Sequence, residues 1–398
     1  MSDSSGSEAQ ATTGTDQFEP IVCHPTDPWG RHALAKSVEW TESWTRRFQR
    51  SCGISAPGDT ASWPVHYMFC IAAALGNETF YILFLPLLMW ISPCVGRQSL
   101  AVWAVQMYVG QALKELYKLP RPTTSFHMES RYVEYGMPST HTSTAVTLAP
   151  LLLMAEMDTL AYHGAPDWMY YVAYSLTAFW VLMCPLSRLY LGVHSVADLV
   201  VGAALGGVIL TAALTCGPLV DAWLLNTTGA ATVLVLCVGS MSFGFPRSTK
   251  QWSTTAADTA IAVGVYMGAM LASMYDAGMH NSACDSRAWQ ASRWTNMQPA
   301  SIAAGMAGAY VIGTLIMLAT RVLMKAIAVP LTQRVVQAGA VNWIIEPTSP
   351  AGEPSVSGRY AAEIAEKLIV YGSLGACATA VVPRVVDALG MVPFPGLS

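Results

Sequence analysis

Apolar stretches of similar length recur along the chain from about residue 65 onward, and short polar segments separate them. Each stretch is close to the ~20 residues that an α-helix needs to cross a lipid bilayer. The pattern predicts an all-α fold, a polytopic transmembrane helical bundle with about nine spans. We place the spans at 65–91, 99–117, 141–158, 168–186, 195–215, 222–243, 257–275, 302–327 and 365–388. Residues 76–79 interrupt the first span, so it is either one tilted helix or a broken pair.

The composition also indicates a membrane protein. Of the 398 residues, 53% are hydrophobic and only 12% are charged, whereas a soluble domain averages roughly 25% charged residues. The formal net charge of −4 gives no reason to expect a nucleic-acid partner. The nine cysteines are scattered, without a CxxC pair or metal-ligand spacing. We therefore expect buried residues or free thiols and infer no disulfide framework.

The segment before the first span has two parts. Residues 1–17 are rich in Ser, Gly, Thr and acidic side chains, which is typical of a disordered tail. Within residues 33–50, Trp40, Trp44 and Phe48 recur at every fourth position and predict a helix with an aromatic face. That helix either lies in the membrane interface or packs against the protein's own bundle.

Three polar segments stand out from this apolar background, and the first contains Lys114 and Arg121. These residues are seven apart, close to two helical turns, although Pro120 and Pro122 are expected to end the helix before Arg121. A lysine point charge beside an arginine fork suits the oxygens of a phosphate. Taken alone, such a pair more often marks the basic end of a span that reaches lipid headgroups.

The second segment is Pro138-Ser139-Thr140-His141, directly before an apolar run. Ser139 or Thr140 is a good helix N-cap, and the free backbone N–H groups of a helix start bind phosphate readily. His141 would lie at the mouth of this anion site, where it could protonate a leaving alkoxide. An isolated histidine at such a place is more often a cap or an interfacial residue.

The third segment contains Ser187, Arg188, His194 and Asp198. His194 and Asp198 are four residues apart at the start of the fifth predicted span, so we expect them on the same side of one helix. Asp198 could accept a proton from one imidazole nitrogen and leave the other free to attack phosphorus. Arg188 would add a further phosphate contact. The alternative is a buried ion pair, but ionisable groups at membrane depth are functional by default.

The order of spans and segments bears on whether these residues can form one site. The first two segments follow the second span and the third follows the fourth span, so all three emerge on one side of the membrane. A metal site is an alternative, with five candidate ligands: Glu129, Glu134, His141, His194 and Asp198. The basic side chains of the same segments would repel a metal cation. We therefore predict catalysis without a metal or another cofactor.

Together the segments read K-x6-RP, P-S-x-H and S-R-x5-H-x3-D, in that order. This trio resembles the signature of the type 2 phosphatidic acid phosphatase superfamily, and it covers about residues 114–198. Thr140, where many members have glycine, and flanks such as Glu134-Tyr135-Gly136 are similar to the sphingosine-1-phosphate phosphatases and their fungal long-chain-base relatives. The resemblance implies a six-helix catalytic core within the bundle.

The resemblance also implies a role for each residue of the trio. His194 would be the nucleophile that forms a phosphohistidine, Asp198 would orient it, and His141 would be the general acid. The phosphoryl oxygens would be held by Lys114, Arg121, Ser139, Thr140 and Arg188. The implied enzyme is a phosphoric monoester hydrolase that converts sphingosine or dihydrosphingosine 1-phosphate into the free long-chain base and phosphate. Its partners would be this lipid substrate and the surrounding membrane lipid.

Two other functions remain open. One is a broad-range phosphatase for lipid phosphates or isoprenyl phosphates and pyrophosphates, and the other is a transporter of anionic lipids. The two lines of reasoning also disagree on which side of the membrane the site opens. Basic residues predicted on the side of the site place it in the cytosol by the positive-inside rule. The resemblance instead implies the lumen of the endoplasmic reticulum.

Three regions follow from these expectations. Residues 1–60 form the tail and the surface helix, residues 61–215 form the catalytic transmembrane core with all three segments, and residues 216–398 add further helices and loops that complete the bundle.

Overall fold

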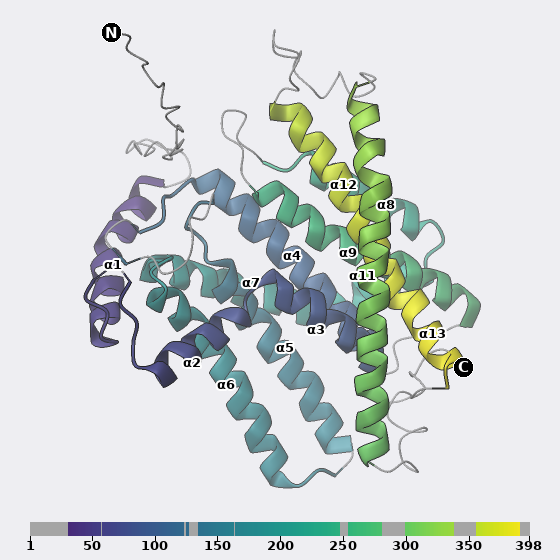
Figure 1. The fold of residues 1–398 in the computed structure, drawn as a ribbon, viewed down its shortest axis with the longest axis horizontal. Coiled ribbons are helices and arrows are strands. Elements are labelled where there is room, and N and C mark those ends of the chain that lie inside the picture. The colour runs from purple at the N-terminus through teal and green to yellow at the C-terminus, as the bar shows by residue number, and fades with distance from the viewer. Residues whose placement is uncertain are drawn as a thin grey trace, which may run out of the picture.

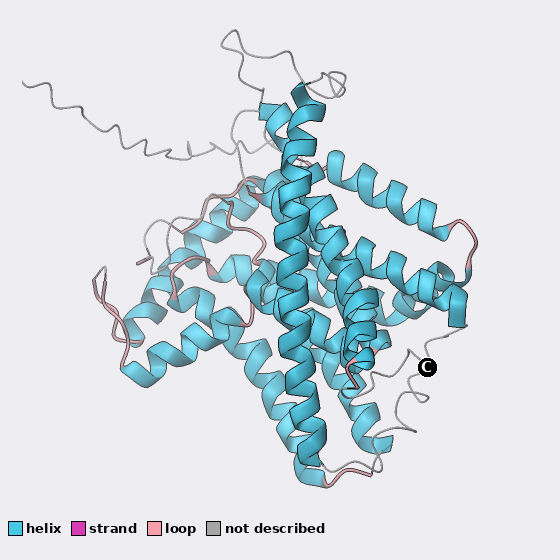
Figure 2. Cartoon of the chain, turned by 45° about the vertical axis from the view of Figure 1, so that its right-hand side comes forward, coloured by secondary structure: helices cyan, strands magenta, loops and turns pink. Residues whose placement is uncertain are grey.

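The computed structural model describes residues 31–56, 58–122, 125–126, 134–162, 164–246, 254–280, 299–337 and 356–390, and every regular element in these ranges is helical (Figures 1 and 2). The first half of the bundle comprises α1 (Arg31–Ser51), α2 (Trp63–Ala74), α3 (Glu78–Ile91), α4 (Pro93–Tyr117), α5 (Thr140–Tyr162) and α6 (Asp167–Tyr190). The second half comprises α7 (Val196–Asn226), α8 (Ala230–Phe243), α9 (Thr255–His280), α11 (Pro299–Gln337), α12 (Val356–Ala376), the π-helical turn η1 (Cys377–Val381) and α13 (Val382–Ala388). The predicted tail at residues 1–17 and Glu129 lie outside the described residues.

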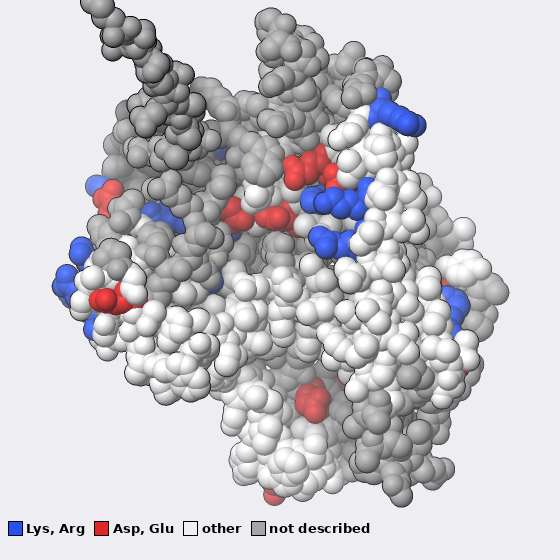
Figure 3. All heavy atoms as spheres, viewed as in Figure 1, with Lys and Arg blue, Asp and Glu red and all other residues white. Residues whose placement is uncertain are grey.

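Six of the described helices are long and apolar enough to cross a membrane, so the chain is a multi-pass membrane protein. They are Thr140–Tyr162, Asp167–Tyr190, Val196–Asn226, Thr255–Asp276, Gly305–Val335 and Tyr360–Ala388. Helices α2 and α3 are bent by 61° relative to each other and add a seventh crossing if they form one span. The first predicted span is therefore a broken pair rather than one tilted helix. On the face seen in Figure 3, charged side chains gather in the upper part and are sparse below it.

The structure differs from the predicted spans at two places. Helix α7 continues through Pro218 to Asn226, so the expected break between residues 215 and 222 is absent. The chain turns instead at Gly229, whose φ of 87° lies in the left-handed region that glycine adopts without strain. Helix α8 then has only 14 residues, about 21 Å of helix against a hydrocarbon core of ~30 Å.

Helix α4 lies at the centre of the bundle, in contact with α3, α5, α7 and α9. It was predicted as a span, but its charged side chains are buried among other helices instead of facing lipid. Arg97 forms two hydrogen bonds of 3.0 Å with Asp221 of α7, and Glu115 accepts one of 2.7 Å from Thr255 of α9. Protein partners thus replace the water that these groups lose, as buried charges require.

Helix α1 packs against the bundle, one of the two alternatives for residues 33–50. Thr41 and Thr45 are buried, and the Thr45 hydroxyl donates to the backbone oxygen of His194 at 3.3 Å. Trp40 and Trp44 lie on the other side of the helix with 68% and 49% of their surface exposed. The helix therefore packs through buried threonines and through apolar residues such as Val38 and Phe48, and it presents its tryptophans outward.

One cysteine differs from the expectation that the cysteines are buried residues or free thiols. Cys94, in the first turn of α4, is disulfide-bonded. The free cysteines among the described residues are Cys52, Cys70, Cys184, Cys216, Cys237 and Cys377. Scattered spacing could not reveal the bond, because a disulfide depends on which segments meet in space.

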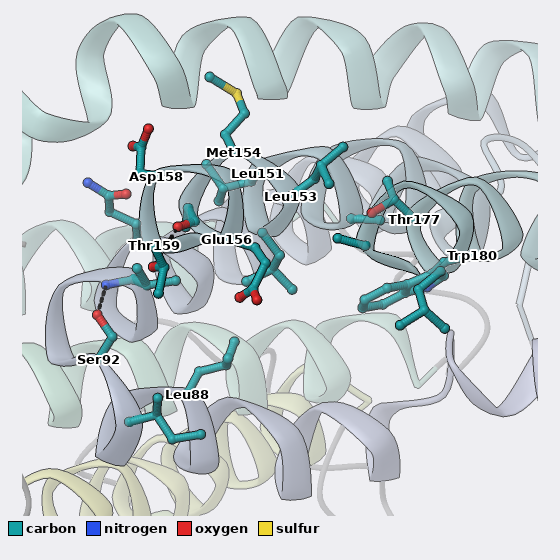
Figure 4. Close-up of a pocket in the computed structure, with 18 of the residues that line it drawn as sticks. Leu88, Ser92, Leu151, Leu153, Met154, Glu156, Asp158, Thr159, Thr177 and Trp180 are labelled. Carbon is teal, nitrogen blue, oxygen red and sulfur yellow. Dashed lines mark hydrogen bonds between the residues drawn. The ribbon is translucent and has the colours of Figure 1, made fainter. Parts of the chain in front are cut away.

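Two cavities lie near opposite ends of α5. The larger, about 760 Å³, is lined mainly by apolar residues of α3, α5 and α6 and by the start of α4. Figure 4 shows Trp180 toward one end of this cavity and Ser92, Asp158 and Thr159 toward the other. The smaller cavity, about 310 Å³, lies where α5 begins and contains the polar segments singled out above.

Candidate active site

The smaller cavity brings together side chains from all three polar segments. Six of the eight predicted site residues line it: Lys114, Arg121, Thr140, His141, Arg188 and His194. Helix α5 leads away from this pocket and α6 returns to it, which is how segments far apart in sequence meet. The other two predicted residues, Ser139 and Asp198, are fully buried and do not line the pocket.

The first segment enters the pocket from the C-terminal end of α4. Lys118 adopts a left-handed conformation with φ 53° and ends the helix by donating its backbone N–H to the Lys114 carbonyl at 2.8 Å. Arg121 therefore lies beyond the helix, as Pro120 and Pro122 predict. Lys114 stays on the last turn with only 2% of its surface exposed. Lys114 on the helix and Arg121 beyond it therefore reach the same pocket from different backbone elements.

Ser139 supports the start of α5 instead of lining the pocket. Its hydroxyl oxygen accepts from the Thr142 hydroxyl at 3.1 Å and from the Thr142 N–H at 3.5 Å. Its own N–H donates to the backbone oxygen of Asp198 at 3.1 Å. These bonds join the start of α5 to the start of α7 and place Thr140 and His141, in the first turn of α5, at the pocket wall.

His194 and Asp198 are close together, but they do not share a helix face as predicted. Helix α7 begins at Val196 with Ser195 as its N-cap, so His194 lies before the helix. Asp198 folds back in a capping box: its Oδ2 accepts the Ser195 N–H at 2.8 Å, and its own N–H donates to Ser195 Oγ at 3.2 Å. The same Oδ2 lies 3.4 Å from His194 Nδ1. The cap, not helical periodicity, sets the His–Asp geometry.

The ring of His194 is 2% exposed and is held between an acid and a base. Arg121 Nη1 lies 3.4 Å from His194 Nε2 and also donates to the Val193 carbonyl at 3.0 Å. A guanidinium can only donate, so Nε2 is the accepting nitrogen and the ring proton is assigned to Nδ1, on the side of Asp198. Burial lowers the pKa of His194 well below its usual value, and the charges of Arg121 and Arg188 lower it further. The imidazole is therefore neutral at physiological pH, with a lone pair available.

His141 lines the same pocket as His194, from the start of α5. Its Nε2 lies 3.2 Å from the side-chain oxygen of Asn77, in the turn between α2 and α3. Gly76 precedes that asparagine, and a Cβ added there would collide with the His141 ring. The break between α2 and α3 thus brings the backbone at Gly76 close to the ring of His141.

Arg188 completes the basic side of the pocket. It lies in the last turn of α6, and only 1% of its surface is exposed. The backbone carbonyl of Arg188 accepts from the Val193 N–H at 3.2 Å, which closes the turn that carries His194. Arg188 therefore supplies a cation to the pocket, and its backbone carbonyl supports the turn that carries His194.

Glu134 has a place in the site that the sequence did not reveal. Its Oε2 lies 2.7 Å from Lys114 Nζ and 3.7 Å from Arg121 Nη2, and its Oε1 accepts from the Thr254 hydroxyl at 3.1 Å. Burial alone would raise the pKa of Glu134, but Lys114 and Arg121 outweigh it and lower the pKa to about 2. The sequence had suggested this carboxylate only as a candidate metal ligand and as a flank of the second segment.

Two further pocket residues, Gln111 and Asp258, were not predicted as site residues. Gln111 lies three residues before Lys114 on α4, a spacing that places both on one helix face. Asp258 comes from the first turn of α9, and no spacing pattern connects it with the three segments. In the part of the chain that the structure describes, no group of three His, Cys, Asp or Glu side chains could hold a metal ion.

Comparison with known proteins supports the resemblance. Residues 96–220 match the model of the PAP2 superfamily. The chain is 37% identical to sphingosine-1-phosphate phosphatase 2 of Mus musculus over 56% of this chain and 65% of that protein. It is 42% identical to sphingosine-1-phosphate phosphatase 2 of Homo sapiens over 37% of this chain and 36% of that protein. The matches thus span less than two thirds of the length of these relatives.

Among solved structures, the chain is similar to a transmembrane PAP2-type phosphatidylglycerolphosphate phosphatase from Bacillus subtilis. The TM-score is 0.36 and the sequence identity 22%, over 46% of this chain and 90% of that chain. The matched region of the PAP2 model contains all three polar segments, from Lys114 to Asp198. By this match and by its ordered motifs, the part of the chain at residues 96–220 is similar to the PAP2 superfamily.

Proposed function

We propose that the protein is a metal-independent lipid phosphatase that hydrolyses sphingosine or dihydrosphingosine 1-phosphate to the free long-chain base and phosphate. The observation that carries the proposal is a buried histidine, His194, beside Asp198 in a small pocket that also contains three basic side chains and a second histidine. The names of the similar phosphatases support the choice of substrate.

In the first step, Lys114, Arg121, Arg188 and Thr140 hold the phosphoryl oxygens, and the Arg121 guanidinium moves from His194 to the phosphate. His194 Nε2 then attacks phosphorus as the bond to the ester oxygen breaks. His141 donates a proton to that oxygen, so the long-chain base leaves as an alcohol. Asp198 stabilises the positive charge that develops on the His194 ring.

In the second step, His141 acts as a base and takes a proton from water, which attacks the phosphohistidine. The bond between phosphorus and Nε2 breaks, which releases phosphate and regenerates the free His194 ring. Every proton moves between water, substrate and the two histidines, so the cycle requires no metal. Ser139 acts through the start of α5, where it keeps Thr140 and His141 in place.

The position of the pocket suits a lipid substrate. It lies at the ends of α4, α5, α6 and α7, where a phosphate headgroup can leave the water phase. Its volume of about 310 Å³ holds a headgroup but not a long hydrocarbon chain, so that chain would remain in the surrounding membrane. This division explains why polar residues gather at helix ends in a mostly apolar protein.

The test is phosphate release by the purified protein from sphingosine and dihydrosphingosine 1-phosphate, with EDTA present. We expect His194→Ala to reduce turnover by about 10³-fold or more, because the attacking group is removed. His66→Ala, on α2 outside the pocket, is the matched control and retains turnover. Undiminished turnover in His194→Ala would exclude the mechanism.

A substrate panel in the same detergent separates the remaining functions. Equal rates on phosphatidate, lysophosphatidate, isoprenyl phosphates and sphingosine 1-phosphate would indicate a broad-range phosphatase. Movement of labelled lipid across liposomes without phosphate release would indicate a transporter.

We further propose that the protein resides in the endoplasmic reticulum with its pocket facing the lumen, as the family resemblance implies. Two features of this chain favour the cytosolic side: the basic residues predicted near the site, and the disulfide at Cys94, at the end of α4 far from Lys114. A protease tag inserted between Phe126 and Glu134 decides the orientation in sealed microsomes. Cleavage only after permeabilisation places the pocket in the lumen, and cleavage of intact vesicles places it in the cytosol.

A further inference from the structure

Helix α1 carries a row of buried polar side chains that the proposed chemistry does not use. Thr41, Thr45 and Gln49 are spaced four residues apart, so they lie along one face of the helix. Their exposed fractions are 7%, 0% and 0%. A buried polar side chain lowers stability unless it finds a hydrogen-bond partner. The partners of this row therefore indicate its role.

Two of these partners are backbone carbonyls at and before His194. Helix α1 packs against α6 and α7, which the connection at residues 191–195 joins (Figure 1). Gln49 Nε2 donates to the Tyr190 carbonyl at 3.0 Å, where α6 ends. The Thr45 hydroxyl donates to the carbonyl of His194 itself at 3.3 Å. Two side chains of α1 thus hold the backbone that carries the candidate nucleophile.

Thr41 extends this contact to the start of α7. Its hydroxyl oxygen accepts the Ala197 N–H at 3.2 Å, one of the N–H groups at a helix start that have no partner within the helix. The capping box of α7 serves the N–H groups of Ser195 and Asp198 and leaves that of Ala197 to α1. The row on α1 therefore supplements the cap that sets the distance between His194 and Asp198.

Gln49 also links the connection to the segment that follows Arg121. Its Nε2 donates to the Phe126 carbonyl at 2.7 Å, and its Oε1 accepts the Phe126 N–H at 3.0 Å. Gly192 lies so close to this pair that an added Cβ would collide with the Phe126 carbonyl oxygen and with Gln49 Nε2. One side chain therefore ties together the backbone segments on which Arg121 and His194 are carried.

The placement of these segments matters for the attack on phosphorus. Arg121 Nη1 lies 3.4 Å from His194 Nε2, the nitrogen that attacks in the proposed mechanism. A misplacement of a reacting group by about 1 Å can reduce a rate about 10²-fold. Each bond from α1 restrains the backbone on which that nitrogen depends.

We propose that Thr41, Thr45 and Gln49 are positioning residues, through which α1 holds His194 in place for attack. None of the three lines the pocket, so they act through the backbone of His194 and not on the substrate. Helix α1 lies before residues 96–220, which match the PAP2 model. The catalytic unit of this chain thus extends beyond the matched region. The inference rests on the proposed function, because it requires His194 as the nucleophile.

The experiment compares catalysis with the binding of a transition-state mimic. Orthovanadate takes a fifth bond from a nucleophile and so mimics the state in which His194 attacks, whereas inorganic phosphate mimics only the bound product. For the purified full chain and its variants, kcat and KM are measured with dihydrosphingosine 1-phosphate, together with the inhibition constants of vanadate and phosphate. Unlike kcat, these inhibition constants do not change when part of a preparation is unfolded.

Thr45→Val is the decisive variant, because it replaces one hydroxyl with a methyl group of similar size; Gln49→Met removes all amide hydrogen bonds of that side chain. We expect kcat to fall about fivefold for Thr45→Val and about tenfold or more for Gln49→Met, and the vanadate inhibition constant to rise by the same factors. KM and the phosphate inhibition constant stay within about twofold. Thr45→Ser retains the hydroxyl and reverses most of the loss. The matched control is Ser43→Ala, on the exposed side of α1, which keeps all four values.

The outcomes separate this inference from the proposed function. An unchanged kcat in Thr45→Val overturns the inference and leaves the phosphatase standing. A lower kcat with an unchanged vanadate inhibition constant does the same, because it shows only a smaller folded fraction. No phosphate release by the unmodified protein overturns the proposed function. Vanadate that inhibits the active protein no more tightly than phosphate does overturns the attack by His194, and the inference with it.

Discussion

The two cavities at opposite ends of α5 differ in what holds their walls together. The smaller pocket is lined by groups fixed through hydrogen bonds and ion pairs between residues far apart in sequence, such as Lys114 with Glu134 and Glu134 with Thr254. The larger cavity is lined mainly by side chains that project from helix interiors, and its two carboxylates, Glu156 and Asp158, are exposed (Figure 4). The two cavities therefore differ in polarity and in how their walls are fixed, as well as in volume.

The comparison shows where a helical membrane protein can place chemistry. Helix ends leave backbone N–H and C=O groups that can cap side chains, and the turns there bring different segments together. Ser195 and Asp198 use such an end to orient His194. Helix interiors satisfy their own backbone groups and offer only side chains. A larger cavity between helix interiors is therefore less suited to catalysis than a smaller pocket at helix ends.

Among substitutions that distinguish the two cavities, Asp198→Asn is expected to have the largest effect. The substitution keeps the shape of the capping residue but removes the charge that lies 3.4 Å from the His194 ring. We expect kcat for the lipid phosphate to fall by about 10²-fold, as for other groups that orient a reacting residue. Thermal unfolding in detergent, measured in parallel, separates this loss from unfolding. Full activity in a folded variant would show that the helix cap has no part in catalysis.

A smaller effect is expected for Gly76→Ala. The added methyl group would displace the His141 ring, so we expect the substitution to act mainly on activity. We expect turnover to decrease about tenfold, because a small misplacement of a reacting group is costly. Gly207→Ala on α7 is the matched control, since a Cβ there meets nothing within 4 Å. Equal activities of the two variants would contradict the close approach of residue 76 to His141.

The smallest effect is expected in the larger cavity. Glu156→Gln removes a carboxylate of the same kind as Glu134, but one that is exposed and lies at the other end of α5. We expect less than about a twofold change in kcat/KM, in line with surface substitutions away from special features. Kinetics on the same substrate check this. A loss as large as that of a pocket variant would mean that the apolar cavity also contributes to the reaction.

Several features of the fold and site could be predicted from local sequence. Apolar stretches of span length predicted an all-α membrane bundle, and the ordered segments predicted that Lys114, Arg121, His141 and His194 meet. These predictions work because hydrophobic length and helix-ending prolines act over a few turns of chain. The interruption at residues 76–79 was likewise visible as a possible break.

Other features could not be read from the chain. The predicted break near residue 218 was wrong, because Pro218 remains inside α7 and the turn comes at Gly229. The buried position of α4 could not be predicted either, because the sequence does not show that Arg97 pairs with Asp221 of α7 or that Glu115 accepts from Thr255 of α9.

The sequence by itself determined the class of protein and the chemical groups of the site, because both depend on residue type and short spacing. Only the tertiary structure decided how those groups are held. It placed Ser139 behind the pocket, joined His194 to Asp198 through a helix cap, and paired Glu134 with Lys114. Asp258 lies far from Lys114 in the sequence, and the contact of α9 with α4 brings the two into one pocket. Long-range packing has no short-range pattern in sequence, so these contacts could not be predicted from the chain alone.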